Sequence, residues 1–303
     1  MNILLNNYCN LSCEYCFAGN VLKEQRQDIS LEGFKKCLEL LPSYHPVSIL
    51  GGEPTLHPQF PEILDMLQRD MRTRVLLFTN GTFKESILNL VIQKRKFMEE
   101  FTVFINFNHP DNIGLKNYQR IKHNIKELIA NNVGVVIRVN IYKPNQDFEY
   151  LYGLCEEFKI KVVSQTICVP RGKVGVKDYF AGLQDTMIDF VDHMRAGGVM
   201  VMTDCNTMPQ CLLPNLGPQY CNHGYHCSPV IDIKPDLTAI RCFGHDSEAV
   251  SIEGFTSVDE LMKHFIEHVD MHIRANKKVL NECEGCDKWE ATKQSCVCLK
   301  FIV

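Results

Sequence analysis

Three cysteines lie close together near the start of the chain, in the stretch CNLSCEYC at residues 9–16. Three residues separate Cys9 from Cys13, and two residues separate Cys13 from Cys16. Thiolate sulfur is a soft ligand that binds iron–sulfur clusters and zinc. A cubane cluster has four irons, so three protein thiolates leave one iron open to a substrate or cofactor, as catalytic metal sites do. A zinc ion with a distant fourth ligand is the alternative.

The whole chain is rich in cysteine, with 15 in 303 residues. Its N-terminus has neither the basic segment nor the apolar core of a signal peptide, so we expect a cytoplasmic protein with reduced thiols. Reduced cysteines at short spacings are typical of metal ligands, and nine of them fall between residues 205 and 298. Cys37 and Cys155 instead lie on apolar helix faces, where we expect ordinary core thiols, and Cys168 follows a strand.

The charge and hydropathy of the chain narrow the classes of partner. The formal net charge is -4 and the isoelectric point is about 6.3, which argues against a nucleic-acid partner. No apolar run approaches the roughly 18 residues that a membrane-spanning helix needs.

The residues before about 197 alternate between strand and helix patterns. Short apolar runs predict strands, and apolar residues at helical spacing predict helices. Six strand–helix units in this order predict an α/β fold with a parallel sheet and right-handed crossovers. The predicted strands cover residues 3–5, 47–50, 74–78, 101–107, 133–141 and 161–167, and the predicted helices cover residues 31–41, 58–72, 84–98, 117–130, 148–158 and 187–195.

Polar residues follow the ends of the first five predicted strands. The cysteine stretch follows the first strand, GGEP the second, TNG the third and NFNH the fourth, while Arg138 and Asn140 close the fifth. Parallel sheets carry their functional loops at the C-terminal ends of the strands. We therefore expect these loops to meet at one edge of the sheet.

The pattern changes beyond about residue 197, where Gly, Pro and Cys become dense and periodicity is weak. We therefore predict two domains, 1–197 and 198–303, with metal replacing apolar packing in the second. A hairpin is expected around Lys-Pro-Asp-Leu-Thr at residues 234–238. Ser257 and Glu260 form a capping box for a helix that continues toward Val269.

The stretch CNLSCEYC fits the CxxxCxφC motif of the radical S-adenosylmethionine (SAM) superfamily, with Tyr15 at the aromatic position φ. A second element of that superfamily, GGEP at residues 51–54, stands where the family carries it, at the end of the second strand. The chain resembles this superfamily over about residues 1–195. The resemblance implies a partial (β/α)6 TIM-like barrel.

The resemblance also implies a chemistry. Cys9, Cys13 and Cys16 would hold a [4Fe–4S] cluster whose open iron chelates the amino and carboxylate groups of SAM. A one-electron reductant such as a flavodoxin or ferredoxin would supply the electron that cleaves SAM to methionine and a 5′-deoxyadenosyl radical. That radical would abstract a hydrogen atom from the substrate, while the protein orients the cofactor.

Roles in SAM binding follow from the motif and from strand-end positions. Gly51 and Gly52 would let the backbone approach closely, and Glu53 with nearby carbonyls suits the ammonium group. Arg138 could clamp the carboxylate, although it is also a plausible surface charge, and the asparagines are equally typical of turns. The remaining candidates are Pro54 in the GGEP element, Asn80, Asn108 and Asn140 for the ribose, the backbone near Tyr15 and Phe17 for the adenine, and Asp204 as a proton acceptor.

The second group of cysteines resembles the SPASM or twitch extension found behind many radical SAM cores. It implies one or two auxiliary [4Fe–4S] clusters, with Leu237 standing where the hairpin usually carries Gly. A SPASM arrangement would place Cys298 on the first cluster. Cys283, Cys286 and Cys296 would then hold a second cluster, with an open iron or with Cys205 or Cys211 as its fourth ligand. A twitch arrangement would instead use Cys227, Cys242, Cys283 and Cys286 for a single cluster, and a zinc site with His223 and His226 is the alternative. The candidate ligands are Cys221, Cys227, Cys242, Cys283, Cys286, Cys296 and Cys298.

The resemblance leaves three functions open. The first is a maturase that crosslinks or oxidises a peptide or protein side chain, served by a separate leader-peptide-binding protein because the chain begins at its first strand. The second is a dehydrogenase or rearranging enzyme that acts on a small molecule such as an aminosugar or nucleotide. The third is a zinc-binding module without catalysis.

Overall fold

The computed structural model describes residues 1–16, 25–72, 74–168, 177–206, 229–243 and 248–271. By their internal contacts the residues form two compact units, 1–137 with 230–262, and 138–229 with 263–303. We describe each unit by itself. The domain boundary predicted near residue 197 rests on the change in amino-acid composition and not on contacts, and it stays a prediction.

The first unit is built on a sheet whose central strands are parallel. Strands β1 (Asn2–Leu4), β2 (Val47–Leu50), β3 (Arg74–Thr79) and β4 (Glu100–Asn106) lie side by side in chain order. Their inward side chains, such as Ile3, are buried in the core. The α/β class and parallel pairing predicted from the alternating pattern are confirmed for this unit.

The predicted hairpin is confirmed, and it joins the other edge of the first strand. Strand β8 (Asp232–Ile233) pairs parallel with β1 and antiparallel with β9 (Thr238–Ile240), which pairs with β10 (Val250–Ser251). Leu237 in the hairpin has φ of 65°, in the left-handed region that favours glycine. Asp232 thereby lies beside Asn2 of the first strand, although 230 positions separate the two residues in the sequence.

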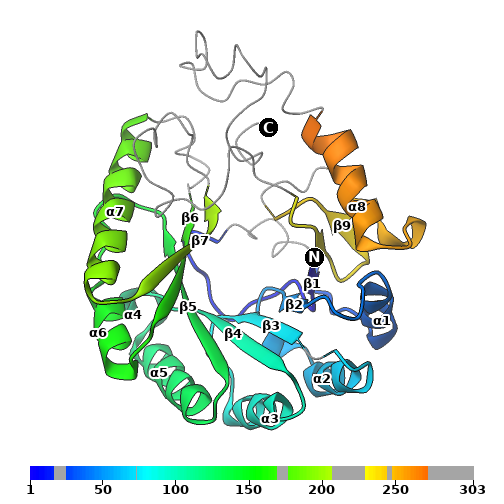
Figure 1. Ribbon diagram of the computed structural model, residues 1–303, viewed down its shortest axis with the longest axis horizontal. Helices are drawn as coiled ribbons and strands as arrows, with labels where there is room; N and C mark the ends of the chain where they lie inside the picture. Colours follow the sequence, from blue (N-terminus) through cyan, green and yellow to red (C-terminus); the bar gives the residue numbers. More distant parts are fainter. Residues whose placement is uncertain (17–24, 73, 169–176, 207–228, 244–247, 272–303) are drawn as a thin grey trace. The chain divides into compact units, whose positions relative to one another are not determined.

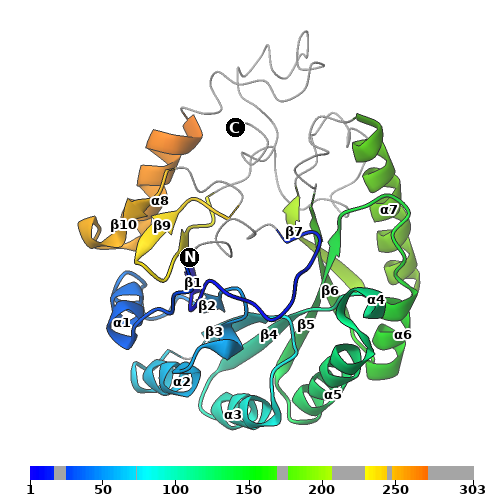
Figure 2. The ribbon, with the colours of Figure 1, turned by 180° about the vertical axis from the view of Figure 1, so that it is seen from behind.

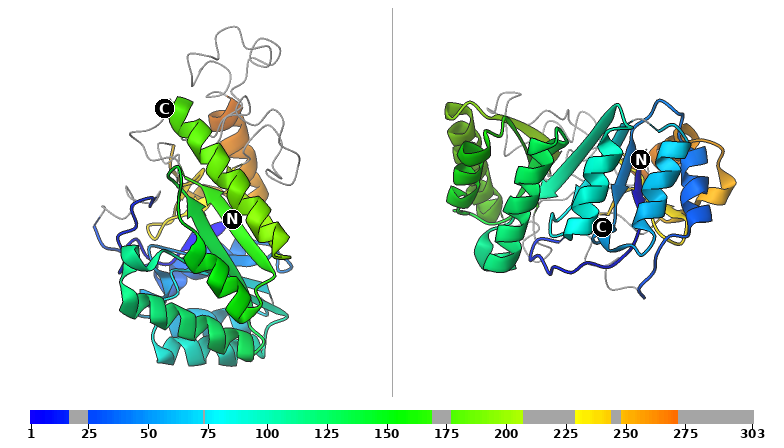
Figure 3. Two further views of the ribbon diagram at one scale, coloured as in Figure 1. Left: turned by 90° about the vertical axis from the view of Figure 1, so that its left-hand side faces the viewer. Right: turned by 90° about the horizontal axis from the view of Figure 1, so that it is seen from below.

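Four helices cover one side of these strands, as Figures 1 and 2 show for α1 (Leu31–Glu39), α2 (Phe60–Arg69), α3 (Glu85–Arg95) and α5 (Leu115–Ala130). Figure 3 shows α2 and α3 side by side. Each helix turns an apolar stripe to the core; in α2 it consists of Phe60, Ile63, Leu64 and Leu67. A single turn, α4 (Pro110–Ile113), precedes α5.

Helix α1 begins and ends at identifiable polar groups. Ser30 caps its N-terminus, because the hydroxyl accepts a hydrogen bond from the Gly33 N–H at 3.0 Å. The sequence predicts that Pro42 ends the helix, but it ends at Glu39. The buried guanidinium of Arg72 donates to the carbonyls of Leu38, Leu41 and Pro42 at 2.7–3.0 Å and thus satisfies the C-terminal end.

The second unit contains β6 (Val162–Ile167) and β7 (Met200–Asn206), which pair in parallel, and helices α6 (Glu149–Phe158) and α7 (Lys177–Ala196). Strand β5 (Gly134–Ile141) crosses from the first unit into the second. Phe190 of α7 packs on Phe148 with ring centroids 4.7 Å apart.

The sequence underestimates the second unit. It predicts only the second half of α7, because Gly182 interrupts the helical pattern; a Cβ there would lie 2.9 Å from Pro144, so the glycine makes room for a neighbouring loop. The sequence does not predict strand β7, because the many Gly and Cys residues around it are typical of irregular chain.

The last described helix follows the predicted apolar pattern. Helix α8 (Val258–His264) continues as a π-helical turn, Phe265–Asp270, and buries Leu261, Phe265 and Val269. The predicted cap at Ser257 is confirmed, because its hydroxyl accepts from the Glu260 N–H at 3.3 Å. The Glu260 carboxylate in addition accepts from the N–H and hydroxyl of Thr256, at 2.8 and 3.0 Å. Within the described ranges, no helix combines the length and apolar composition that crossing a bilayer requires.

Candidate functional site

The three N-terminal cysteines lie in the loop that follows β1, and all three are half-buried and form no disulfide. Burial raises the pKa of Cys9 to about 11 and also raises the pKa of Cys13. Neighbouring thiols add to both shifts, Cys13 to that of Cys9 and Cys16 to that of Cys13, so the thiols lie within electrostatic reach. The main-chain N–H of Cys16 donates to the Cys13 carbonyl at 3.1 Å and folds the loop.

This donor set fits an iron–sulfur cluster. Each thiolate of a cubane binds a different iron, so the sulfurs are spread around the cluster. A structural zinc ion instead needs its ligands gathered about 2.3 Å from one point. In the described part of the chain, no three His, Cys, Asp or Glu side chains are gathered in the way that a single ion requires. Three thiolates from one loop, each available to a different iron, fit a cubane cluster.

The GGEP element packs directly on the segment that leads into Cys9. The Gly52 N–H donates to the main-chain and side-chain oxygens of Asn6, both at 3.1 Å, and the Glu53 N–H donates to the Tyr8 carbonyl at 2.9 Å. The Asn6 amide returns a bond to the Glu53 carbonyl at 2.8 Å. A Cβ on Gly52 would lie 2.2 Å from the Tyr8 oxygen, so only glycine fits.

The side chain of Glu53 is fully buried and its carboxylate is held by the chain's own donors. It accepts from the N–H and hydroxyl of Thr55 at 3.2 and 2.6 Å, from the Thr79 hydroxyl at 2.7 Å and from the Asn80 N–H at 2.7 Å. Burial raises the pKa of Glu53, and these bonds oppose the shift. Pro54 begins a 3₁₀ turn, Pro54–Leu56, at the position where proline is favoured. The carboxylate thus ties the loop after β2 to the end of β3, and an ammonium group would have to share it.

Two asparagines at the ends of β3 and β4 reach the cysteine loop. The side-chain amide of Asn80 donates to the Cys9 sulfur at 3.6 Å, and that of Asn108 donates to the Cys13 sulfur at 3.6 Å. The Tyr15 hydroxyl donates to the side-chain oxygen of Asn108. The loops after the first four strands therefore meet, as the sequence predicts. The ribose contacts predicted for Asn80 and Asn108 stay predictions.

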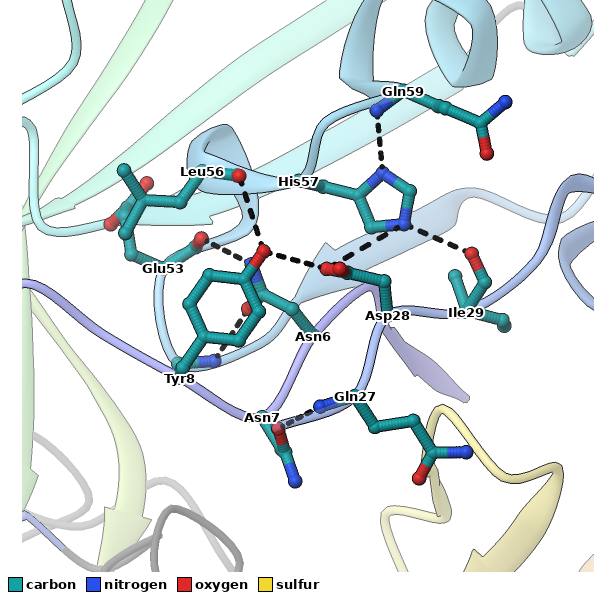
Figure 4. Close-up of polar contacts among 11 residues, drawn as sticks. Asn6, Asn7, Tyr8, Gln27, Asp28, Ile29, Glu53, Leu56, His57 and Gln59 are labelled. Atoms are coloured by element: carbon teal, nitrogen blue, oxygen red, sulfur yellow. Dashed lines mark hydrogen bonds and ion pairs between the residues drawn. The ribbon is translucent and has the colours of Figure 1, made fainter. Parts of the chain in front are cut away.

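A further polar network, not foreseen from the sequence, fastens the segment before Cys9 (Figure 4). The Tyr8 hydroxyl donates to the Asp28 carboxylate at 2.7 Å. His57 lies 4.0 Å from the same carboxylate and is almost completely buried. The Gln59 N–H donates to Nδ1 of His57 at 3.1 Å. Nε2 of His57 therefore carries the proton and donates to the Ile29 carbonyl at 2.9 Å.

The same segment is also paired through its backbone with residues beyond the cysteine loop. The N–H of Asn7 donates to the Gln27 carbonyl at 3.3 Å, and the Gln27 N–H donates to the Asn7 side chain at 2.8 Å. Asn6 and Asp28 form an antiparallel bridge. The only sequence signal is that three polar residues, Asn6 to Tyr8, follow an apolar strand directly before Cys9.

The candidates on β5 lie in the second unit. Arg138 contacts the Thr166 hydroxyl at 3.5 Å, and the buried Asn140 side chain accepts from the Cys168 thiol at 3.5 Å. The Asn140 carbonyl accepts from the side chain of Gln146 at 2.8 Å. Asp204 lies in strand β7, not in a loop, and its side chain is outside the described residues. Their roles stay predictions.

One candidate auxiliary ligand is described. Cys242 follows β9 and is half-buried, and Arg241 donates to its sulfur at 3.7 Å. The next residue, Phe243, packs on Leu4 together with Cys16, so the hairpin contacts the N-terminal cysteine loop. The other predicted site residues lie outside the described residues: Phe17, Cys221, Cys227, Cys283, Cys286, Cys296 and Cys298.

Two curated relatives match parts of this sequence. The S-adenosylmethionine-dependent nucleotide dehydratase of Fibrobacter sp. (strain UWH6) is 27% identical over 203 residues, which is 59% of this chain and 58% of the relative. The antilisterial bacteriocin subtilosin biosynthesis protein AlbA of Bacillus subtilis (strain 168) is 35% identical over 98 residues, 31% of this chain and 21% of AlbA. The matched region thus spans less than two thirds of either relative.

The fold and the family are also matched. The solved structure of native anSMEcpe with bound AdoMet and Kp18Cys peptide superposes with a TM-score of 0.68, covering 98% of this chain and 88% of that chain at 19% identity. At this identity the likeness shows a shared fold. The family model of the radical SAM superfamily matches residues 3–155, about half of the chain. The chain is therefore a member of the radical SAM superfamily, whose enzymes use a [4Fe–4S] cluster and SAM.

Proposed function

We propose that Cys9, Cys13 and Cys16 hold the [4Fe–4S] cluster of this radical SAM enzyme and that its substrate is a peptide or protein side chain. The presence of three half-buried thiols in the loop after β1, beside the GGEP element, supports the first part. When bound, the cluster and SAM supply a 5′-deoxyadenosyl radical that takes a hydrogen atom from the substrate.

The residues around the cysteines position the cofactor site. Gly51 and Gly52 place main-chain groups against Asn6 and Tyr8, which fixes the distance between GGEP and the cysteine loop. Main-chain carbonyls of this element suit an ammonium group better than the Glu53 carboxylate, which already accepts four hydrogen bonds. Arg138 and Asn140 remain our candidates for carboxylate and ribose, and Asp204 for the proton acceptor.

We place at least one auxiliary [4Fe–4S] cluster in the C-terminal part. Cys242, at the end of the hairpin, is its best-supported ligand because its sulfur accepts a hydrogen bond from Arg241. The remaining ligands would come from Cys221, Cys227 and the C-terminal cysteines. Such a cluster could accept the electron left after hydrogen abstraction, and a flavodoxin-like or ferredoxin-like protein would supply the first electron.

The likeness to proteins with peptide substrates supports the proposed substrate class. AlbA is named for the biosynthesis of a bacteriocin, and the anSMEcpe structure was solved with a peptide. The match to anSMEcpe covers almost all of this chain, including the part beyond the radical SAM family match. Such an enzyme would take a separate leader-peptide-binding protein as its partner.

A small-molecule substrate is the second candidate. Between the two curated relatives described above, the nucleotide dehydratase matches this chain over a larger part of its own length than AlbA does. Two incubations separate the candidates. Peptides encoded next to the gene should lose two hydrogen atoms per modification, measured by mass spectrometry with SAM and reductant. Loss of water from a nucleotide in the parallel incubation, with the peptides unchanged, would replace the peptide proposal.

The cluster assignment is tested by changing Cys9, Cys13 and Cys16 together to Ala in anaerobically purified protein. We expect 5′-deoxyadenosine formation to vanish and the iron and sulfide contents to fall by about four atoms each, while the remaining iron stays. The variant Cys155→Ala is the control, because this thiol lies in the core of the other unit. Zinc without sulfide in the unchanged protein, or persistent 5′-deoxyadenosine in the triple variant, contradicts the assignment.

A further inference from the structure

Two buried side-chain amides donate hydrogen bonds to cysteine sulfurs of the N-terminal loop. Asn80 donates to Cys9 and Asn108 donates to Cys13, each at 3.6 Å between nitrogen and sulfur. Asn80 is 7% exposed and Asn108 is 6% exposed, so little water competes for these amides. The Leu11 N–H also donates to the Cys9 sulfur, at 3.4 Å.

The orientation of the Asn80 amide is fixed by its other contacts. Its oxygen accepts from the N–H and the hydroxyl of Thr82, at 2.9 and 2.7 Å. Its nitrogen donates a second bond to the side-chain oxygen of Asn10 at 2.8 Å. Turning the amide around would place oxygen against oxygen and nitrogen against an N–H, so the nitrogen must face the sulfur.

The Asn108 amide contacts the cysteine loop at both ends. Its oxygen accepts from the Tyr15 hydroxyl and its nitrogen donates to the Cys13 sulfur. A thiolate that binds a metal has no proton and only accepts, so the nitrogen must face it. Tyr15 belongs to the cysteine loop itself and its ring is buried. Both amides come from strand ends, β3 and β4, and are therefore held by the sheet.

We propose that Asn80 and Asn108 set the reduction potential of the cluster by donating hydrogen bonds to its thiolate ligands; this inference rests on the proposed function of the three cysteines. Reduction adds negative charge that spreads onto the sulfurs. An N–H dipole directed at a sulfur stabilises the reduced form more than the oxidised form, and so raises the potential. Removing one donor therefore makes the cluster harder to reduce.

The test measures the midpoint potential in anaerobically loaded full-length protein. We follow the electron paramagnetic resonance signal that changes on adding SAM, because this separates the N-terminal cluster from auxiliary clusters. The variants are Asn80→Ser, Asn108→Ser and the double variant. The midpoint should shift to more negative values in each single variant and furthest in the double variant.

The matched control is Asn124→Ser. Asn124 is equally buried, and its amide donates to the carbonyls of Gly81 and Phe83 at 2.8 and 3.0 Å, so it has the same kind of contacts without sulfur. Its midpoint should equal that of the unchanged protein. Unchanged midpoints in the Asn80 and Asn108 variants overturn the inference, and so does an equal shift in the control.

The experiment also separates this inference from the proposed function. If the cysteines do not hold a cluster, the unchanged protein lacks the signal that responds to SAM. If they do, and Asn80→Ser or Asn108→Ser folds with the circular-dichroism spectrum of the unchanged protein but loses the cluster, the amide serves cluster retention and not the potential. That outcome also overturns the tuning role.

Discussion

The main-chain N–H of Asn80 donates a 2.7 Å hydrogen bond to Oε2 of Glu53, so one buried carboxylate joins the loops after β2 and β3. In Glu53→Gln, the new amide would face donors from Thr55, Thr79 or Asn80. Leaving a buried donor without an acceptor costs about 1–3 kcal/mol. We expect the free energy of unfolding, measured in urea, to fall by this amount.

The control for this variant is Glu62→Gln on the exposed start of α2. Its effect should stay within about 1 kcal/mol, the contribution of a charge near a helix N-terminus. Equal stability of Glu53→Gln and the unchanged protein would show that the carboxylate is not needed to join the two loops.

Gly52→Ala should damage the site because its Cβ would lie 2.2 Å from the Tyr8 carbonyl. The backbone before Cys9 must then move, at a cost of about 1–3 kcal/mol or more. We expect lower stability and less iron per chain after reconstitution. In α6, Gly153 has no atom within 4 Å of its would-be Cβ, so Gly153→Ala should stabilise by about 0.4–1 kcal/mol and retain full iron. Full iron content in Gly52→Ala would contradict the close-approach role.

Arg72→Leu should lower stability by about 2–4 kcal/mol, because the carbonyls of Leu38, Leu41 and Pro42 lose their donor. Thermal unfolding by circular dichroism measures the effect. Arg69→Leu is the control, since Arg69 is exposed and bonds only within its own helix in the described contacts. Similar melting temperatures for the two variants would mean that the end of α1 is satisfied in another way.

Two core thiols should resist alkylation. Burial raises the pKa of Cys37 and of Cys155 to about 12, so at pH 8 only on the order of one in 10⁴ of these groups is thiolate, the reactive form. Peptide mapping after iodoacetamide treatment should find both unlabelled in the native protein and labelled after denaturation. Rapid native labelling of either residue would show that its helix opens.

These thiols also make stability depend on pH. Unfolded cysteines lose their proton near pH 8.5, whereas folded Cys37 keeps it until about pH 12. In that window the folded state binds more protons, so stability falls as pH rises. Cys37→Ala should flatten the decline between pH 8.5 and 10 in urea unfolding, and an unchanged slope would contradict the shift.

Much of the first unit is predictable from the sequence because its elements have one apolar face. Strand β2 coincides with the prediction, and the cap of α1 at Ser30 forms as expected. The second unit is less predictable, since Gly182 serves a packing contact and looks like a helix break. Local periodicity carries no information about such contacts between segments.

The candidate site is predictable in its motifs and not in its contacts. The cysteine spacing and GGEP indicate where the chemistry lies. The amides of Asn80 and Asn108 point at sulfur because of side-chain directions that strand-end position does not determine. The network of Tyr8, Asp28 and His57 joins residues far apart in sequence and has no motif.

The pairing of Asn6 and Asn7 with Gln27 and Asp28 closes the base of the cysteine loop with bonds made by protein alone. Closing a loop costs chain entropy that grows with the logarithm of its length. These contacts close the base of the loop without a metal ligand, so metal binding does not have to supply that part of the closure entropy.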